Sequence, residues 1–382
     1  MGVETDERRT DLRDVARACQ GMAGFVAVRF PATDRRIAIG YDGLPRSEAR
    51  ARTAAEVFAA NGVQAFLFDR PMPAPTLSYA ARVLQCAAGV MLTDADAPAA
   101  GGGCRFYGPD GSRVGAETAA TQAGADGPDP LDDPGRMTFD VALSRGRIAW
   151  IPDWVATSFV KEVKRQSPLF GAPVDKSFSI AYTPRNGAGR EMVPRALAEG
   201  GYGNVIVLPE ADGQETMRHV LERAGRTDAD LLLATDADCG RCALAAKGPE
   251  GFRPMTGDEA GLLLLDFVCQ RRQDLGLMPA DPVLVLAGDV PDAAERVAAG
   301  CGARAVRVAK GFEHIGEVVA RLEAEGRPDS FLFGLEAGGG CLTGRYTRER
   351  DGVGAALLLC DMFAWHRSQG VDLFGRLDAL RA

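Results

Sequence analysis

Short apolar segments, each followed by a polar or glycine-rich turn and then by a helical pattern, recur along the whole chain. One series starts at residues 36–42, a second at 178–184 and a third at 281–288. Strands that alternate with helices favour α/β domains with largely parallel sheets. The sequence therefore predicts three consecutive α/β units of about 100–150 residues each.

The expected elements follow from apolar runs, caps and turn residues. In the first unit Ser47 is the predicted N-cap of a helix that ends at Asn61 and Gly62. Thr256 to Glu259 form a predicted capping box for a helix through residue 275. A long amphipathic helix is expected over 353–368. The predicted strands are 36–42, 63–69, 90–92, 178–184, 204–210, 229–238, 281–288, 305–308 and 330–336, and the remaining helices are 77–87, 154–166, 190–199, 214–225, 293–299 and 313–325.

The net charge and the cysteine content indicate which partners and which cellular compartment to expect. The formal net charge of −8 leaves no basic surplus to neutralise phosphates, so we expect neither nucleic acid nor a membrane surface as partner. The N-terminus is charged from residue 4 and has no apolar core of a signal peptide. Nine scattered cysteines, an odd number, are typical of reduced thiols. We expect a cytoplasmic protein.

The polar ends of the predicted strands are where α/β proteins usually place their chemistry. The loop after 90–92 reads T-D-A-D-A-P-A-A-G-G-G-C-R and contains no serine, histidine or lysine. The strand at 229–238 ends in Asp236 and Asp238, and the strand at 330–336 ends in Glu336. These three loops are the candidate site segments.

Seven stretches in order resemble the phosphoglucomutase/phosphomannomutase (α-D-phosphohexomutase) family. G-Y-D-G-L-P-R-S (40–47) resembles the family's G-x-D-x-R-x-x-S, and residues 57–78 resemble V-L-A-A-N-G-I-x-V-x-L-F-D-x-P-x-P-T-P-x-L-S. The loop after 90–92 stands where the family has T-A-S-H-N-P. Further matches are Y-T-P-R-N-G-A-G (182–189), A-T-D-A-D-C-G-R (234–241), F-G-L-E-A-G-G-G (333–340) and D-G-V-G-A-A-L-L-L (351–359).

The resemblance implies three phosphohexomutase-type α/β domains, each with a mixed sheet covered by helices. We expect domain I over 1–160, domain II over 161–277 and domain III over 278–382. We expect the family's N-terminal arm and its fourth domain, with its R-P-S-G-T-E-P loop, to be missing. The resemblance also implies a reversible phosphate shift on a hexose phosphate through a phosphoserine and a bound Mg²⁺.

The residues that the resemblance assigns to phosphoryl transfer are replaced. The family's serine corresponds to Ala95, and a methyl group cannot carry phosphate. The family's proton-transfer lysine corresponds to Arg105, whose guanidinium cannot give or take a proton near neutrality. Asn186 stands where the family usually has histidine. Asp94 and Asp96 flank Ala95 as alternative nucleophiles, although neither occupies the serine's position.

The metal and sugar loops are partly kept. Asp236 and Asp238 match two Mg²⁺ ligands, but the third position is Gly240, which makes magnesium binding doubtful. Cys239 and Cys242 form a lone C-x-x-C, which is weak evidence for zinc or for redox chemistry.

The resemblance leaves three candidate binding residues for a sugar phosphate. Glu336 matches the carboxylate that grips two sugar hydroxyls, while Arg241 and Arg105 are the candidates for holding phosphate.

Three hypotheses follow. The first is a family member that has lost the mutase reaction, a catalytically inactive or impaired pseudoenzyme that binds a hexose phosphate or a partner. The second is an active sugar-phosphate enzyme of altered chemistry that uses Asp94 or Asp96. The third is a fragment of a longer gene. Under the first, the face of domain III that meets the fourth domain in the family would bind a protein partner or a second copy of the chain.

Overall fold

The computed structural model describes residues 2–93, 103–114, 130–132, 136–169, 171–209, 216–248 and 250–382, with side chains from residue 11 onward. Its contacts divide the chain into two compact units, residues 1–156 and 157–382. Each unit is described by itself. The domain boundaries after residues 160 and 277 stay a prediction.

The first unit contains one mixed sheet of five strands, as the sequence predicts for the first domain. The strand order is β4-β3-β1-β2-β5, and only the β3–β4 pair is antiparallel. The central strands are short and apolar, so they are buried on both faces, as parallel strands between helices require. The strands are β1 (Arg36–Tyr41), β2 (Gln64–Leu67), β3 (Ala88–Leu92), β4 (Cys104–Tyr107) and β5 (Ile148–Trp150).

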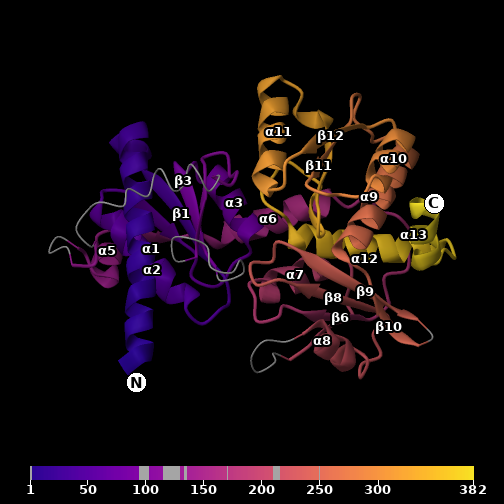
Figure 1. Ribbon diagram of the computed structural model, residues 1–382, viewed down its shortest axis with the longest axis horizontal. Helices are drawn as coiled ribbons and strands as arrows, with labels where there is room; N and C mark the ends of the chain where they lie inside the picture. Colours follow the sequence, from indigo (N-terminus) through magenta and orange to yellow (C-terminus); the bar gives the residue numbers. More distant parts are fainter. Residues whose placement is uncertain are drawn as a thin grey trace. The chain divides into compact units, whose positions relative to one another are not determined.

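Helices cover this sheet, and the first of them was not predicted. Helix α1 packs beside α2 (Figure 1), and Arg50 of α2 donates from two nitrogens to Asp11 of α1 at 2.8 and 2.6 Å. The helical segments are α1 (Gly2–Arg29), η1 (Ala32–Asp34), α2 (Ser47–Ala60), α3 (Ala74–Val83) and α5 (Phe139–Ser144).

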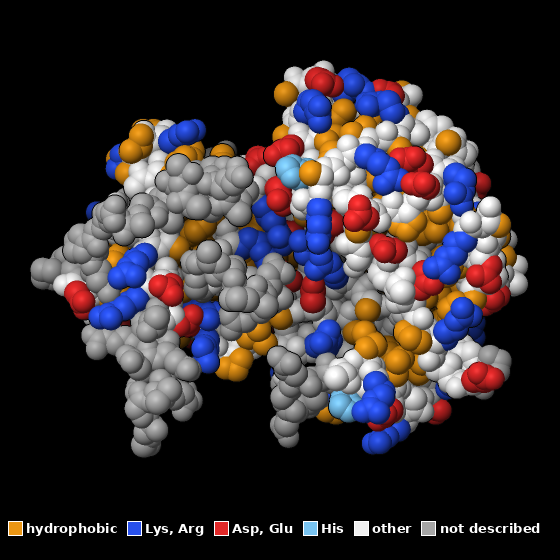
Figure 2. Space-filling model, in the orientation of Figure 1, with side chains coloured by type: hydrophobic (Ala, Val, Ile, Leu, Met, Phe, Trp, Pro, Cys, Tyr) orange, Lys and Arg blue, Asp and Glu red, His pale blue; other side chains and the backbone are white. Residues whose placement is uncertain are grey.

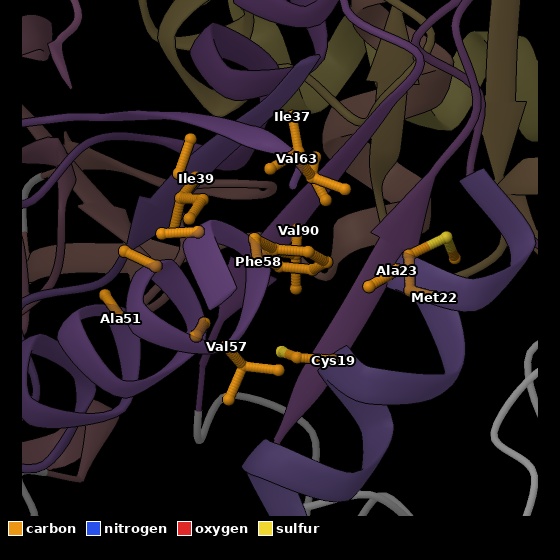
Figure 3. Packing of buried hydrophobic residues seen from close by; sticks show 14 of the residues in the cluster. Cys19, Met22, Ala23, Ile37, Ile39, Ala51, Val57, Phe58, Val63 and Val90 are labelled. Carbon is orange, nitrogen blue, oxygen red and sulfur yellow. The ribbon is translucent and has the colours of Figure 1, made fainter. Parts of the chain in front are cut away.

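The core of the first unit lies between α1, α2 and the sheet. Figure 3 shows Phe58 of α2 close to Val90 of β3, with Met22 and Cys19 of α1 nearby. All four side chains are almost completely buried. This core fixes the end of β3, the strand that precedes Ala95 in the sequence.

The second unit contains two further mixed sheets, which also matches the prediction. Their strand orders are β10-β9-β8-β6-β7 and β12-β11-β13-β14. The sheet segments are β6 (Ile180–Thr183), β7 (Val205–Val207), β8 (Leu231–Thr235), β9 (Cys242–Gly248), β10 (Gly251–Pro254), β11 (Val283–Ala287), β12 (Arg304–Val308), β13 (Phe331–Glu336) and β14 (Gly340–Leu342).

The helices of the second unit begin close to the predicted positions. They are α7 (Gly189–Glu199), α8 (Met217–Ala224), α9 (Gly257–Asp274), α10 (Ala293–Gly300), α11 (Phe312–Ala324), η2 (Pro328–Ser330), α12 (Gly352–Ser368) and α13 (Leu373–Arg381), while α6 (Asp153–Arg165) spans the boundary between the units.

Helix α12 joins the two sheets of the second unit. Figure 1 shows it between the sheet of β6–β10 and the sheet of β11–β14, and it contacts α7, α9, β9 and β14. Its buried Asp361 accepts hydrogen bonds from Tyr202 at 2.6 Å and from Ser167 at 2.5 Å. The two sheets of residues 157–382 therefore share one interior.

Three local predictions can be compared with the structure. The capping box of Thr256 and Glu259 is confirmed. The prediction of Ser47 as N-cap is wrong, because Ser47 is the first helical residue and its hydroxyl donates to Asp42 at 2.5 Å. The prediction that α12 is amphipathic is also wrong, because it is buried on nearly all sides by elements on both sheets.

The visible surface of the second unit is mixed in character. Figure 2 shows acidic, basic and apolar side chains interspersed over residues 157–382 on that face. Among the described residues, no helix combines the length and the apolar character needed to cross a bilayer.

Candidate functional site

The candidate site of the second unit is formed by loops at the carboxyl ends of parallel strands. Strands β6 and β8 are neighbours in one sheet, and β13 ends in the third sheet. Carboxyl ends of parallel strands meet at one edge of a sheet, which places the loops after β6 and β8 together. The contact of Arg241 with Glu336 at 3.2 Å joins the end of β13 to them.

The loop after β8 is a tight turn held by its own aspartates. Asp236 accepts a hydrogen bond from the backbone N–H of Arg241 at 2.9 Å, and Asp238 accepts one from Gly240 at 3.2 Å. Cys239 has a φ of 54°, in the left-handed region that few non-glycine residues adopt. Both aspartates thus also serve to shape the loop.

The Asp238 carboxylate opposes the ionisation of Asp236. The pKa of Asp236 is raised to about 7, first by loss of solvation and second by the nearby Asp238 carboxylate. The Arg241 guanidinium lies 3.9 Å from Asp236 and counteracts that rise.

The turn after β6 locks against this loop. Arg185 and Asn186 have φ values of 48° and 60°, and Asn tolerates this left-handed conformation better than most residues. A Cβ on Gly187 would lie 2.7 Å from the Cα and the carbonyl oxygen of Ala237, so only glycine fits there. The position of Asn186 is therefore set by a turn that depends on glycine at position 187.

Glu336 lies at the end of β13 and is paired with two guanidinium groups. Its side chain is 4% exposed, and its Oε2 is 2.8 Å from Arg350 Nε and 3.2 Å from Arg241 Nη2. Asp236, Arg241, Glu336 and Arg350 thus form one chain of charges, which we call the Glu336 cluster. A buried carboxylate is stable in such a place because paired cations compensate its charge.

Arg350 was missed in the sequence. It lies in the run Thr347–Asp351, all of which is buried although four of its five residues are charged. Charged runs are usually solvated, so the composition gave the opposite signal. One local signal was its position directly before the D-G-V motif at the start of α12. In the structure the Gly352 N–H of this motif donates to the Cys239 carbonyl at 3.0 Å, which holds the start of α12 beside the Glu336 cluster.

Models of three domains from one family match this chain. The descriptions are phosphoglucomutase/phosphomannomutase alpha/beta/alpha domain I over residues 4–123, domain II over 157–250 and domain III over 256–378. The chain belongs to the phosphoglucomutase/phosphomannomutase family.

Individual members of this family are distant relatives. A Schizosaccharomyces pombe protein named "Probable phosphoribomutase" is 27% identical over 91% of this chain and 62% of its own length. A phosphoglucomutase of Staphylococcus saprophyticus is 26% identical over 85% of this chain and 61% of its own length. The chain therefore spans about three fifths of the length of these curated relatives.

Solved structures support the fold. A Thermus thermophilus protein superposes with a TM-score of 0.72 at 20% identity, covering 96% of this chain and 78% of that one. A phosphoglucomutase/phosphomannomutase family protein of Burkholderia thailandensis gives 0.69 at 16% identity, covering 97% and 75%. The three-domain α/β prediction is confirmed.

The remaining predicted positions belong to the first unit. Arg105 lies on β4 opposite Met91 of β3 and is partly buried. Ala95, Asp94 and Asp96 lie outside the described residues. Of the three predicted binding residues, the structure thus brings Arg241 and Glu336 together, and it describes Arg105 within the other unit.

The metal loop of this family member does not fit a three-carboxylate site. Gly240 supplies no ligand, and Asp236 and Asp238 already accept backbone hydrogen bonds. Among the residues that the structure describes, no group of three His, Cys, Asp or Glu side chains could hold a metal ion. Mg²⁺ requires near-octahedral oxygen ligation, which two aspartates alone supply poorly.

The C-x-x-C of the same loop consists of two buried thiols. Burial raises the pKa of Cys239 and of Cys242, the nearby Asp236 adding to both shifts. A raised pKa disfavours the thiolate, which is the form that binds metals and exchanges disulfides.

Proposed function

We propose that this family member binds a hexose phosphate and has lost all or most of the family's intramolecular phosphoryl transfer. The Glu336 cluster carries the proposal. Glu336 is the counterpart of the carboxylate that reads sugar hydroxyls, and Arg350 and Arg241 hold it in place. The Arg241 side chain is 35% exposed, which leaves its guanidinium able to meet a phosphate.

The loss of phosphoryl transfer is argued from three replaced positions. Ala95 offers no oxygen nucleophile, Arg105 cannot transfer a proton, and Gly240 removes a carboxylate from the metal loop. In a serine protease, loss of the nucleophile alone lowers the rate by about 10⁶-fold. Loss of several such groups is expected to leave turnover far below that of an ordinary mutase.

Binding is tested by calorimetry with glucose 1-phosphate, glucose 6-phosphate, mannose 6-phosphate and ribose 5-phosphate. The ribose compound is included because one relative is named as a phosphoribomutase. We expect Glu336→Gln to weaken binding at least about tenfold, since a neutral amide accepts sugar hydroxyls less strongly. Arg345→Met, which breaks only the exposed pair with Asp329, is the matched control. No heat of binding for any sugar phosphate would contradict the proposal.

Turnover is tested with glucose 1-phosphate, Mg²⁺ and a hexose bisphosphate activator. We expect turnover far below that of an ordinary mutase, and intact mass spectrometry should show no phosphate adduct. Turnover at an ordinary mutase rate would contradict the proposal. A stable phosphate adduct on Asp94 or Asp96 would instead support altered chemistry at those residues.

The other functional expectations stay predictions. They are a cytoplasmic location, a protein partner or second copy on domain III, and no nucleic-acid partner. Because the metal loop lacks its third carboxylate, we propose that sugar phosphate binds with the same affinity in EDTA as in Mg²⁺.

A further inference from the structure

Helices α9 and α10 bring two cysteine thiols into contact. Neither cysteine belongs to the Glu336 cluster. Cys269 lies in α9 and Cys301 directly follows the last residue of α10, and their sulfur atoms are 3.1 Å apart. The Cys301 thiol also lies 3.2 Å from the carbonyl oxygen of Ala298. A disulfide has an S–S distance of about 2.05 Å, so the sulfurs need to approach by only about 1 Å.

The pair borders a cavity. A hollow of about 370 Å³ is lined by both cysteines, by Asp266 and Arg376, and by the exposed residues Gln273 and Gly300. A cavity of this size admits several water molecules, and its exposed lining residues place its mouth at the surface. A small polar oxidant can therefore reach thiols that are otherwise only 1% and 7% exposed.

The two thiols differ in acidity. The contact between the two sulfurs lowers the pKa of Cys301 to about 7, while the same contact and burial raise the pKa of Cys269. Since the thiolate is the nucleophile, Cys301 is the sulfur that reacts first. By contrast, burial raises the pKa of Cys86, Cys341 and Cys360.

We propose that Cys269 and Cys301 form a reversible disulfide when the protein meets a peroxide. The Cys301 thiol loses its proton and the thiolate attacks one peroxide oxygen; the O–O bond breaks to give a sulfenic acid and hydroxide, and the hydroxide takes up that proton to form water. The Cys269 thiol, on losing its proton, then attacks the Cys301 sulfur, and a second water leaves. Two thiols and one hydrogen peroxide thus give one disulfide and two waters.

The bond fastens α9 to α10 within the second unit. The first turn of α9 contacts the loop after Glu336, because Asp258 accepts a hydrogen bond from the Gly338 N–H at 2.7 Å. The modified helix is therefore one that also supports the candidate site, although the modification itself needs no ligand at that site.

The test uses the reduced full chain treated with near-stoichiometric hydrogen peroxide. Free thiols are then alkylated in denaturant at acid pH, and the protein is digested without reductant. We expect a linked peptide pair that contains Cys269 and Cys301, an intact mass lower by two hydrogen atoms before alkylation, and full reversal by dithiothreitol.

Variants separate this pair from the other cysteines. Cys301→Ser and Cys269→Ser should each abolish the linked pair, whereas Cys360→Ala, a buried thiol in α12, should leave its yield unchanged. The proposal is overturned if all nine cysteines of the wild-type chain remain alkylatable after peroxide. It is equally overturned if the linked peptides join other cysteines instead.

Discussion

Glu336 is a buried carboxylate whose stability depends on residues far away in the sequence. Arg350 and Arg241 approach one of its oxygens at 2.8 and 3.2 Å. Moving a charge out of water costs several kcal/mol, and the cost is recovered only while its partners remain. Single substitutions in the Glu336 cluster are therefore expected to have effects larger than those on the surface.

Arg350→Met should lower the free energy of unfolding by about 3 kcal/mol, because it leaves Glu336 buried with one cation instead of two. Arg345→Met, which breaks an ion pair with Asp329 that is 88% exposed, should cost less than about 1 kcal/mol. Urea denaturation of both variants measures the difference. Equal, small losses would show that Arg350 is not a structural partner of Glu336.

Gly240→Asp should create affinity for Mg²⁺ and Mn²⁺ by supplying the third carboxylate. Gly240 has no positive φ, and the nearest atom to an added Cβ is Asp238 Oδ1 at 3.3 Å, so the side chain fits after a small adjustment. Calorimetry should show binding at least about tenfold tighter than in the wild type. Gly240→Asn is the neutral control, and wild-type affinity equal to that of the aspartate variant would refute the expectation.

At the scale of elements, α12 depends on a buried cap. Asp351 accepts hydrogen bonds from the N–H groups of Val353 at 3.0 Å and Gly354 at 2.9 Å, and Tyr346 donates to its other oxygen. Capping carboxylates normally favour the ionised form, but here burial dominates and raises the pKa of Asp351 to about 6.

This raised pKa makes stability depend on pH. A carboxyl group whose pKa is higher in the folded state contributes stability below about pH 4 that is lost as the pH rises to about 6. The loss amounts to about 3 kcal/mol. Asp351→Asn removes this pH-dependent contribution. The unfolding free energy of the variant minus that of the wild type should therefore rise by about 2–3 kcal/mol between about pH 4 and pH 7.

Denaturation curves at several pH values check this prediction. Asp372→Asn is the matched control, because Asp372 caps α13 in the same way, through Gly375 N–H at 2.8 Å, but lies at the surface. Parallel pH profiles for the wild type and Asp351→Asn would rule out a raised pKa at the cap.

The sequence predicted most elements where apolar runs and caps agree, as at β11 and at the capping box of α9. It also contained an unused signal: Val15, Cys19, Met22 and Val26 recur at helical spacing, and all are buried against α2. Strand β9 carried no such signal, because its alanine-rich sequence has low strand propensity and only pairing with β8 makes it a strand.

For the candidate site, the sequence predicted Asp236, Arg241 and Glu336 through family motifs. It could not predict that these residues join Arg350 in one buried cluster, because burial of a charge depends on partners that folding brings together. Nor could it predict the contact of Cys269 with Cys301, since the two thiols belong to helices separated by a strand.

At the scale of the whole molecule, each of the two compact units has a core of its own. The first is built around Phe58, while the second is organised around α12. Units with their own cores are able to unfold in separate steps, and then a single unfolding transition is not expected.

The three tryptophans report on the units separately. Trp150 and Trp154 lie in the first unit, and Trp365 lies in the second. In urea, fluorescence of Trp365→Phe should follow the first unit, and fluorescence of the double variant Trp150→Phe/Trp154→Phe should follow the second. We expect the two fluorescence curves to have different urea midpoints. Circular dichroism of each variant should show both unfolding transitions. Superimposable curves by all probes would mean that the units unfold together.

The position of α12 also has a consequence for synthesis on the ribosome. The sheet of β6–β10 leaves the ribosome well before α12, yet α7, β9 and Tyr202 pack on this later helix. Until α12 emerges, the apolar face that it covers stays open to chaperones and to other nascent chains. A pause in translation just before residue 352 would prolong that exposure, so codon usage there should affect the yield of folded protein more than codon usage within the first unit.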